Sequence, residues 1–109
     1  MDRIDAVPPG EIDFRVETPE AGMAVVTIVG DLDLASVDRL GAAVDPLLAA
    51  GLERLILEVG ELRFADSSAI ALWVQWSTRV RDIELRDPSA LLRRVITTMG
   101  LAGRLRVTP

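Results

Sequence analysis

The sequence has 109 residues, half of them apolar, which predicts one domain with a hydrophobic core. Its 12 basic residues are all arginines and are outnumbered by 17 acidic ones, so the formal net charge is -5 and a nucleic-acid partner, which requires a basic face, is not expected. The chain has no histidine, cysteine, lysine or tyrosine, which excludes disulfides, thiolate metal sites and most general bases.

The hydropathy pattern and the first residues bear on where the chain resides. No apolar run reaches the roughly 18–20 residues that cross a bilayer. Residues 1–10, which include Pro8-Pro9-Gly10, lack the apolar segment of a signal peptide. We therefore expect a cytoplasmic protein without membrane insertion. Residues 1–10 are predicted to form a flexible N-terminal lead-in, and residues 11–109 a single domain.

Periodicity predicts two strands and a helix in the first half of the chain. Residues 12–16 alternate apolar and charged side chains, and a turn-forming segment then leads into an apolar strand at 23–29. Apolar residues at helical spacing predict a helix over 37–50. Pro46 interrupts this pattern, either as a kink or as the first residue of a new helix.

Strands and helices alternate in the second half. Strands are predicted near 55–59, 83–85 and 105–107, separated by one helix from Ser67 to about Arg81 and by another that begins after the N-cap Asp87. The apolar face of this last helix includes Leu91 and Met99.

The resulting order, β-β-α-β-α-β-α-β, predicts an α/β fold with a mixed, mainly parallel sheet and flanking helices. Binding sites in such sheets lie beyond the carboxyl ends of the strands. The loops at residues 30–33 and 60–68 both follow strands that lead into helices, so we expect them to meet at that end of the sheet.

Two aspartates, Asp31 and Asp33, follow the second predicted strand. They could form a metal-binding or acid–base pair, or they could serve turn and N-cap chemistry. The second interpretation is favoured, because a lone Asp-x-Asp lacks the third ligand and the glycine of a calcium loop. We predict no metal site and no cofactor.

Asp66-Ser67-Ser68 opens the second predicted helix. Asp66 is a strong candidate N-cap, which would place Ser67 and Ser68 in the first turn, near the positive end of the helix dipole. An exposed hydroxyl there could serve as a cap, as a nucleophile or as a phosphate acceptor. Nucleophilic catalysis requires a base that this chain lacks, so we do not expect an enzyme. On spacing alone, a phosphate acceptor and an ordinary first-turn serine are equally supported.

Trp73 and Trp76 lie three residues apart in the same predicted helix. Together with Ala69 and Val80 they recur at helical spacing, which predicts that all four lie on one buried face of the helix. We therefore expect both tryptophans to be core residues rather than a binding platform.

The stretch from Phe64 to Ala71, preceded by Gly-Asp-Leu-Asp at 30–33 and Leu-Ile-Leu-Glu at 55–58, resembles a STAS domain of the anti-sigma factor antagonist kind. The resemblance covers roughly residues 12–107. It implies that the hydroxyl residue directly after the aspartate, Ser67, is the phosphoacceptor, with Ser68 as the backup. The residues that it implies in partner binding are Gly30, Leu32, Asp33, Phe64, Asp66, Ser67, Ser68, Ala69 and Ile70.

The resemblance further implies a serine phospho-switch. The unphosphorylated form would bind an anti-sigma factor that is also a serine kinase and brings its own ATP, and this binding would release a sigma factor. Phosphorylation at Ser67 would weaken the complex, and a separate serine phosphatase would reverse it. The alternative is a constitutive STAS scaffold subunit of a stressosome-like or transporter-associated complex. Alanines at 69 and 71, where the family has glycines, favour this alternative slightly.

Overall fold

A computed structural model describes residues 7–109 of the chain. Its helices and strands follow one another as β1 (Ile12–Glu20), β2 (Met23–Leu32), α1 (Val37–Ala49), β3 (Arg54–Glu58), β4 (Leu62–Ala65), α2 (Ser67–Ser77), β5 (Asp82–Arg86), α3 (Ala90–Thr98) and β6 (Arg106–Thr108). The predicted alternation of strands and helices is confirmed, with β4 as an additional strand. Among these helices, none combines the length and the apolar character needed to cross a bilayer.

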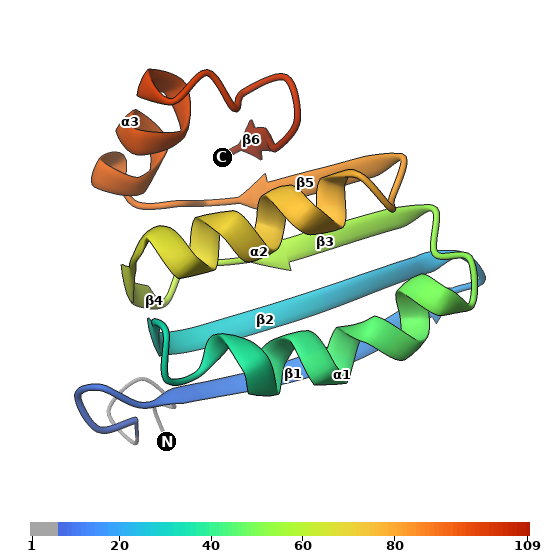
Figure 1. The fold of residues 1–109 in the computed structure, drawn as a ribbon, viewed down its shortest axis with the longest axis horizontal. Helices are drawn as coiled ribbons and strands as arrows, with labels where there is room; N and C mark the ends of the chain where they lie inside the picture. Colours follow the sequence, from blue (N-terminus) through green and yellow to red (C-terminus); the bar gives the residue numbers. More distant parts are fainter. Residues whose placement is uncertain (1–6) are drawn as a thin grey trace.

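The strands of the described chain form one six-stranded sheet (Figure 1). β1 and β2 are antiparallel, whereas β2–β3, β3–β5 and β5–β6 are parallel pairs, which gives the order β1-β2-β3-β5-β6. Figure 1 shows α1 and α2 lying across one face of this sheet. The mixed, mainly parallel α/β fold predicted from the sequence is therefore confirmed.

β4 is the strand that the sequence analysis did not predict. It pairs with residues 30–32 of β2, whereas β3 pairs with residues 23–27 of the same strand. Because β1 occupies the other edge of β2, β3 and β4 must share one edge. A strand of four residues carries too little periodicity to be recognised, and its pairing exists only because β2 is ten residues long.

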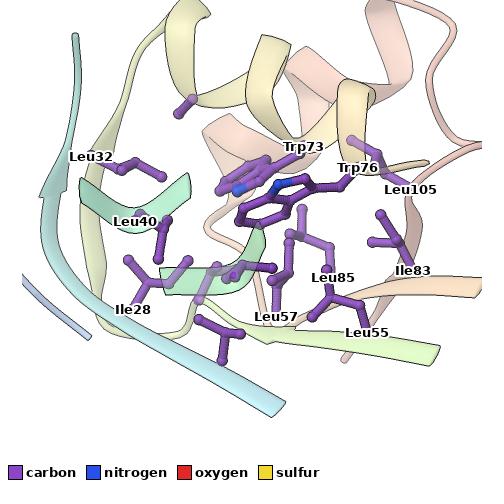
Figure 2. Close-up of a cluster of buried hydrophobic side chains, with 14 of the residues drawn as sticks. Ile28, Leu32, Leu40, Leu55, Leu57, Trp73, Trp76, Ile83, Leu85 and Leu105 are labelled. Carbon is purple, nitrogen blue, oxygen red and sulfur yellow. The ribbon is translucent and has the colours of Figure 1, made fainter. Parts of the chain in front are cut away.

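The hydrophobic core lies between the sheet and the helices. Alternate residues of the central strands face it, for example Leu55 and Leu57 of β3, which are fully buried. Figure 2 shows Trp73 and Trp76 of α2 in the same cluster as Leu57 and Leu85. Trp73 is 0% exposed and Trp76 is 3% exposed, so their predicted role as core residues is confirmed.

α2 ends at Ser77, earlier than the predicted Arg81. The hydroxyls of Ser77 and Thr78 donate to the carbonyl oxygens of Val74 and Gln75, at 2.6 and 2.7 Å. These side-chain bonds take carbonyls that a continuing helix would use, which explains the early stop.

The other helices also differ in detail from the prediction. Pro46 lies inside α1, which continues through it. The predicted N-cap Asp87 is wrong, because the hydroxyl of Ser89 caps α3 by accepting the Leu92 N–H at 3.1 Å. Asp87 instead adopts a positive φ of 58° in the turn after β5, a conformation that aspartate tolerates better than most residues.

Two residues predicted on the buried face of α3 are exposed. Leu91 is 72% exposed and Met99 is 56% exposed, whereas Leu92 and Ile96 are buried. α3 therefore buries a narrower face than its apolar pattern indicates.

Part of the predicted N-terminal lead-in contacts the domain. Val7 is buried, the Pro8 carbonyl accepts a hydrogen bond from Arg63 Nη2 at 2.9 Å, and the Gly10 N–H donates to the Asp31 carboxylate. Residues 7–10 therefore contact the domain, and the flexibility of the N-terminal segment stays a prediction. Residues 1–6 lie outside the described part of the chain.

Glu84 is a buried acid in the middle of β5, with only 5% of its surface exposed. Its carboxylate accepts hydrogen bonds from Arg54 at 3.2 Å, Arg86 at 3.0 Å and Thr108 at 2.8 Å. Burial by itself raises the pKa of Glu84, but these hydrogen bonds and the charge of Arg86 outweigh it and lower the pKa from 4.5 to about 2. Glu84 thus ties three neighbouring strands together as an anion.

We predict that Glu84 makes the stability of the fold dependent on pH. A carboxylate whose pKa is lower in the folded state stabilises the fold above its unfolded pKa, and this contribution is lost as the pH falls from 4.5 towards 2. Glu84→Gln should lower the free energy of unfolding at pH 7 by about 3 kcal/mol and flatten its decrease below pH 4.5. Urea unfolding between pH 2 and pH 7 measures both effects.

The matched control is Glu17→Gln, which removes an exposed carboxylate paired with Arg15 at 3.3 Å. It should change the free energy of unfolding by about 0.5 kcal/mol or less. A Glu84→Gln protein with the stability and acid profile of the Glu17→Gln control would contradict this assignment.

Candidate functional site

Asp66 organises the first turn of α2. Its backbone is extended, with φ -94° and ψ -171°, and its Oδ1 accepts the N–H groups of Ser68 at 2.9 Å and Ala69 at 3.3 Å. The Ser68 hydroxyl donates to the same oxygen. Asp66 is therefore the N-cap that the sequence predicts, and it satisfies N–H groups that have no partner within the helix.

The second oxygen of the Asp66 carboxylate joins two loops. Oδ2 accepts the Leu34 N–H at 3.3 Å, and the Asp66 N–H donates to the Leu32 carbonyl at 3.3 Å. The hydrogen bond from the Ser68 hydroxyl, followed by those from backbone N–H groups, lowers the pKa of Asp66 even though partial burial raises it. The predicted meeting of the loops at 30–33 and 60–68 is thus confirmed.

Ser67 and Ser68 have different surroundings. Ser67, the first residue of α2, is exposed, and its hydroxyl forms no hydrogen bond within residues 7–109. Ser68 is half-buried, and its hydroxyl is engaged with Asp66. Ser67 therefore carries the accessible hydroxyl of this pair.

Asp33 and Ser36 close the turn after β2. The Asp33 carboxylate accepts the Ala35 N–H at 3.0 Å, and the buried Ser36 hydroxyl accepts the Asp33 N–H at 3.0 Å. This is the turn chemistry favoured by the sequence analysis over a metal or acid–base pair. In the part of the chain that the structure describes, no three acidic residues are arranged to hold a metal ion.

Gly30 and Asp31 attach the end of β2 to its neighbours. Gly30 has a φ of +102°, and a Cβ at this position would lie 2.4 Å from the Glu11 carbonyl oxygen and 2.7 Å from Val7 Cγ1. Asp31 Oδ1 lies 3.3 Å from Nε of Arg63 in β4. Gly30 is therefore required for close packing inside the fold.

The nine residues predicted to bind a partner differ in how far they are exposed to solvent. Phe64 and Ser67 are exposed, and Asp33, Asp66 and Ser68 are half-buried around them. The remaining four are buried: Gly30, Leu32, Ala69 and Ile70. The end of β2 and the inner face of α2 turn these four towards the protein interior, and their contact with a partner stays a prediction.

Two residues of the site were not singled out from the sequence. Leu34 is 76% exposed and gives its N–H to Asp66, and Ser36 holds Asp33 in the turn. Leu34 lies two residues after the buried Leu32 and three before the buried Val37, so the sequence pattern does not mark it as exposed. Ser36 lies directly before α1, where a serine is expected as an N-cap, but its side chain bonds backwards to the turn.

Within residues 7–109, the arrangement provides an accessible hydroxyl but no group to activate it. The carboxylate next to Ser67 already accepts four hydrogen bonds, from Leu34, Ala69 and both donors of Ser68. A carboxylate with a lowered pKa is also a weak base. The Ser67 hydroxyl is therefore suited to accept a group delivered by another protein.

The fold and the site define a class: a single α/β domain that presents a serine at the carboxyl end of a mixed sheet. The family model described as "Mlab, STAS domain" matches residues 16–108. The chain therefore belongs to the STAS domain family. No curated protein matches the sequence.

Several solved structures share this fold. An anti-sigma factor antagonist from Mycobacterium paratuberculosis superimposes with a TM-score of 0.83 at 20% identity, covering 94% of this chain and 90% of that one. The anti-sigma factor antagonist SpoIIAA in its unphosphorylated form has a TM-score of 0.77 at 22% identity, over 89% of both chains. The phosphorylated form, from Bacillus, has a TM-score of 0.74 at 22% identity, over 89% of this chain and 92% of that one.

We predict that Gly30 tolerates no side chain. Gly30→Ala should lower the free energy of unfolding by at least about 2 kcal/mol, because the new Cβ would collide with backbone and the φ of +102° is unfavourable for alanine. Gly103→Ala is the control, since a Cβ there meets nothing within 4 Å, and it should stay within about 0.5 kcal/mol of the parent. Equal urea midpoints for the two variants would refute the close packing described for Gly30.

We predict that the Asp66 cap stabilises the start of α2. Asp66→Ala should lower the free energy of unfolding by about 1 kcal/mol, whereas Asp66→Asn, which keeps the capping oxygen and loses only the acceptor of the Leu34 N–H, should lower it less. Amide hydrogen exchange should quicken at Ser68 and Ala69, whose N–H groups the cap binds, in the alanine variant only. Unchanged exchange at both amides would show that the cap has no energetic role.

Proposed function

We propose that this protein is an anti-sigma factor antagonist that works as a serine phospho-switch, with Ser67 as the phosphoacceptor. The observation that carries the proposal is the exposed Ser67 hydroxyl at the start of α2, beside a carboxylate whose own hydrogen bonds are already made. Membership of the STAS family and the fold shared with anti-sigma factor antagonists support it.

The fold can accept a phosphate at Ser67. A phosphoserine adds roughly -1.5 to -2 charges, and the N-terminal end of a helix favours negative charge. The Ser67 hydroxyl makes no hydrogen bond within residues 7–109 that modification would break. The domain therefore stays folded when it is phosphorylated.

The effect of the phosphate falls on the partner interface. The new charge joins those of Asp66 and Asp33 at the same end of the sheet, and a partner that fits the unmodified surface would have to desolvate it. A loss of about 3 kcal/mol lowers the affinity roughly a hundredfold, which is enough for a switch.

Ser68 is less suited than Ser67 to this role. Its hydroxyl donates to the Asp66 carboxylate, so phosphorylation would break a capping hydrogen bond and place the phosphate against that carboxylate. Ser68 is therefore only a backup acceptor.

The partners that this function requires are proteins of the same compartment, which we take to be the cytoplasm. One is an anti-sigma factor with serine kinase activity, which supplies ATP from its own site. The other is a serine phosphatase that restores the binding form. The antagonist itself needs no cofactor.

The test is phosphorylation by the anti-sigma factor kinases of the source organism. Each purified kinase is incubated with ATP and with the parent protein, Ser67→Ala or Ser68→Ala, and the products are mapped by tandem mass spectrometry. We expect one phosphoryl group on the parent and on Ser68→Ala, and none on Ser67→Ala. An unmodified Ser67 in the presence of a kinase that binds the protein would refute the switch.

A constitutive STAS scaffold subunit, in a stressosome-like or transporter-associated complex, is the second candidate. Ala71 favours it, because this exposed residue lines the hollow between α1 and α2, where the resemblance implies a glycine. Ala69, the other replaced glycine, is fully buried and does not alter the surface. Partner binding that is unaffected by Ser67→Asp would favour the scaffold over the switch.

A further inference from the structure

A small apolar groove lies beside the proposed phosphorylation site, between β4, α2 and α3. Its volume is about 150 Å³. Exposed side chains stand on two of its sides, Phe64 at 53% and Leu91 at 72% exposure. Apart from Ala65, the apolar residues that line it are Leu62, Phe64, Ile70, Leu91, Leu92 and Val95.

The exposure of Leu91 distinguishes this groove from incomplete core packing. Leu92 and Ile96 bury the inner face of α3, but Leu91 projects from the same helix into solvent at the groove. An exposed apolar rim around an apolar hollow is characteristic of a surface that binds another molecule.

The groove has an unpaired cation at its edge in a protein of net charge -5. The described residues that line it include no carboxylate, and the lining Arg63 is already paired with Asp31. Arg94 lies three residues after Leu91, so it occupies the same side of α3. Arg94 is exposed and forms no ion pair within residues 7–109. The charge around the groove therefore complements an acidic ligand.

We propose that this groove binds one aromatic or leucine side chain from an acidic segment of the protein partner. A cavity of about 150 Å³ lined by Leu, Ile and Phe is large enough for a benzene ring. The same volume is too small for the length of a lipid acyl chain. An acidic residue next to the anchor would face Arg94.

This inference rests on the proposed function for the identity of the partner but not for the chemistry of the groove. Ala65 and Ile70, which line the groove, lie within three residues of Ser67 in the chain. A partner anchored in the groove would therefore be held beside the Ser67 hydroxyl. The groove would contribute affinity whether or not Ser67 is phosphorylated.

The groove can be tested with synthetic peptides. The probe is a hexapeptide with one phenylalanine flanked by glutamates and aspartates, and the controls replace either the phenylalanine by alanine or the acidic residues by lysines. In titrations followed by NMR, we expect the probe alone to shift the methyl signals of Ile70, Leu91 and Val95, and both controls to bind at least about tenfold more weakly. Equal shifts with the lysine peptide, or none with the probe, would overturn the proposal.

A parallel titration with decanoic acid distinguishes a peptide ligand from a lipid. Binding of decanoic acid to the groove more tightly than the acidic phenylalanine peptide would overturn the choice of a protein segment. Weaker binding, or no binding, would support it.

Variants of the protein itself provide a second test of the groove with the same acidic peptide. Leu91→Ser and Arg94→Glu should each weaken binding of the acidic peptide about tenfold. Met99→Ser, at an exposed residue outside the groove, and Arg93→Glu, on the opposite side of α3, should leave it unchanged. Weakening by the control variants as large as by Leu91→Ser would count against the groove.

The kinase assay separates failure of the groove from failure of the switch. If Ser67 is phosphorylated equally fast in the parent and in Leu91→Ser, the switch stands and the groove is not used by that partner. If the acidic peptide binds the parent but not Leu91→Ser, and no kinase modifies Ser67, the groove stands and the switch fails.

Discussion

The structure depends on the unequal lengths of β2 and β3. β2 has ten residues and β3 has five, so half of one edge of β2 is left free, and β4 pairs with it. This pairing brings the end of β4 beside the end of β2, where the Asp66 N–H donates to the Leu32 carbonyl. The start of α2, and with it Ser67, is thereby placed next to the turn that follows β2.

Asp66 then holds the start of α2 and the turn after β2 in a fixed arrangement. One of its oxygens caps α2 and the other holds the Leu34 N–H, so a single carboxylate fixes the helix and the neighbouring loop together. Its cap also engages the Ser68 hydroxyl, which leaves Ser67 as the unbonded serine within the described chain. The Ser68 hydroxyl reaches the cap and the Ser67 hydroxyl does not, because successive residues of a helical turn point in different directions.

The same end of the sheet has two surfaces of opposite character. The turn of Asp33 and the cap of Asp66 carry negative charge, whereas the groove between β4, α2 and α3 is apolar and has Arg94, unpaired within residues 7–109, at its edge. Charge added at Ser67 would act on the first surface, while the second would hold an apolar anchor regardless of that charge. A partner that uses both could be regulated without losing all of its affinity.

Local sequence patterns were enough to predict the order of the elements other than β4, the Asp66 cap, the turn chemistry of Asp33 and the burial of both tryptophans, because periodicity and capping depend on residues close together in the chain. The pairing of β4 with β2, the burial of Leu32 beneath the site and the exposure of Leu91 follow from the three-dimensional packing alone. These features depend on which distant segments pack together. The sequence does not show whether an apolar side chain is buried by a distant segment or left exposed to solvent.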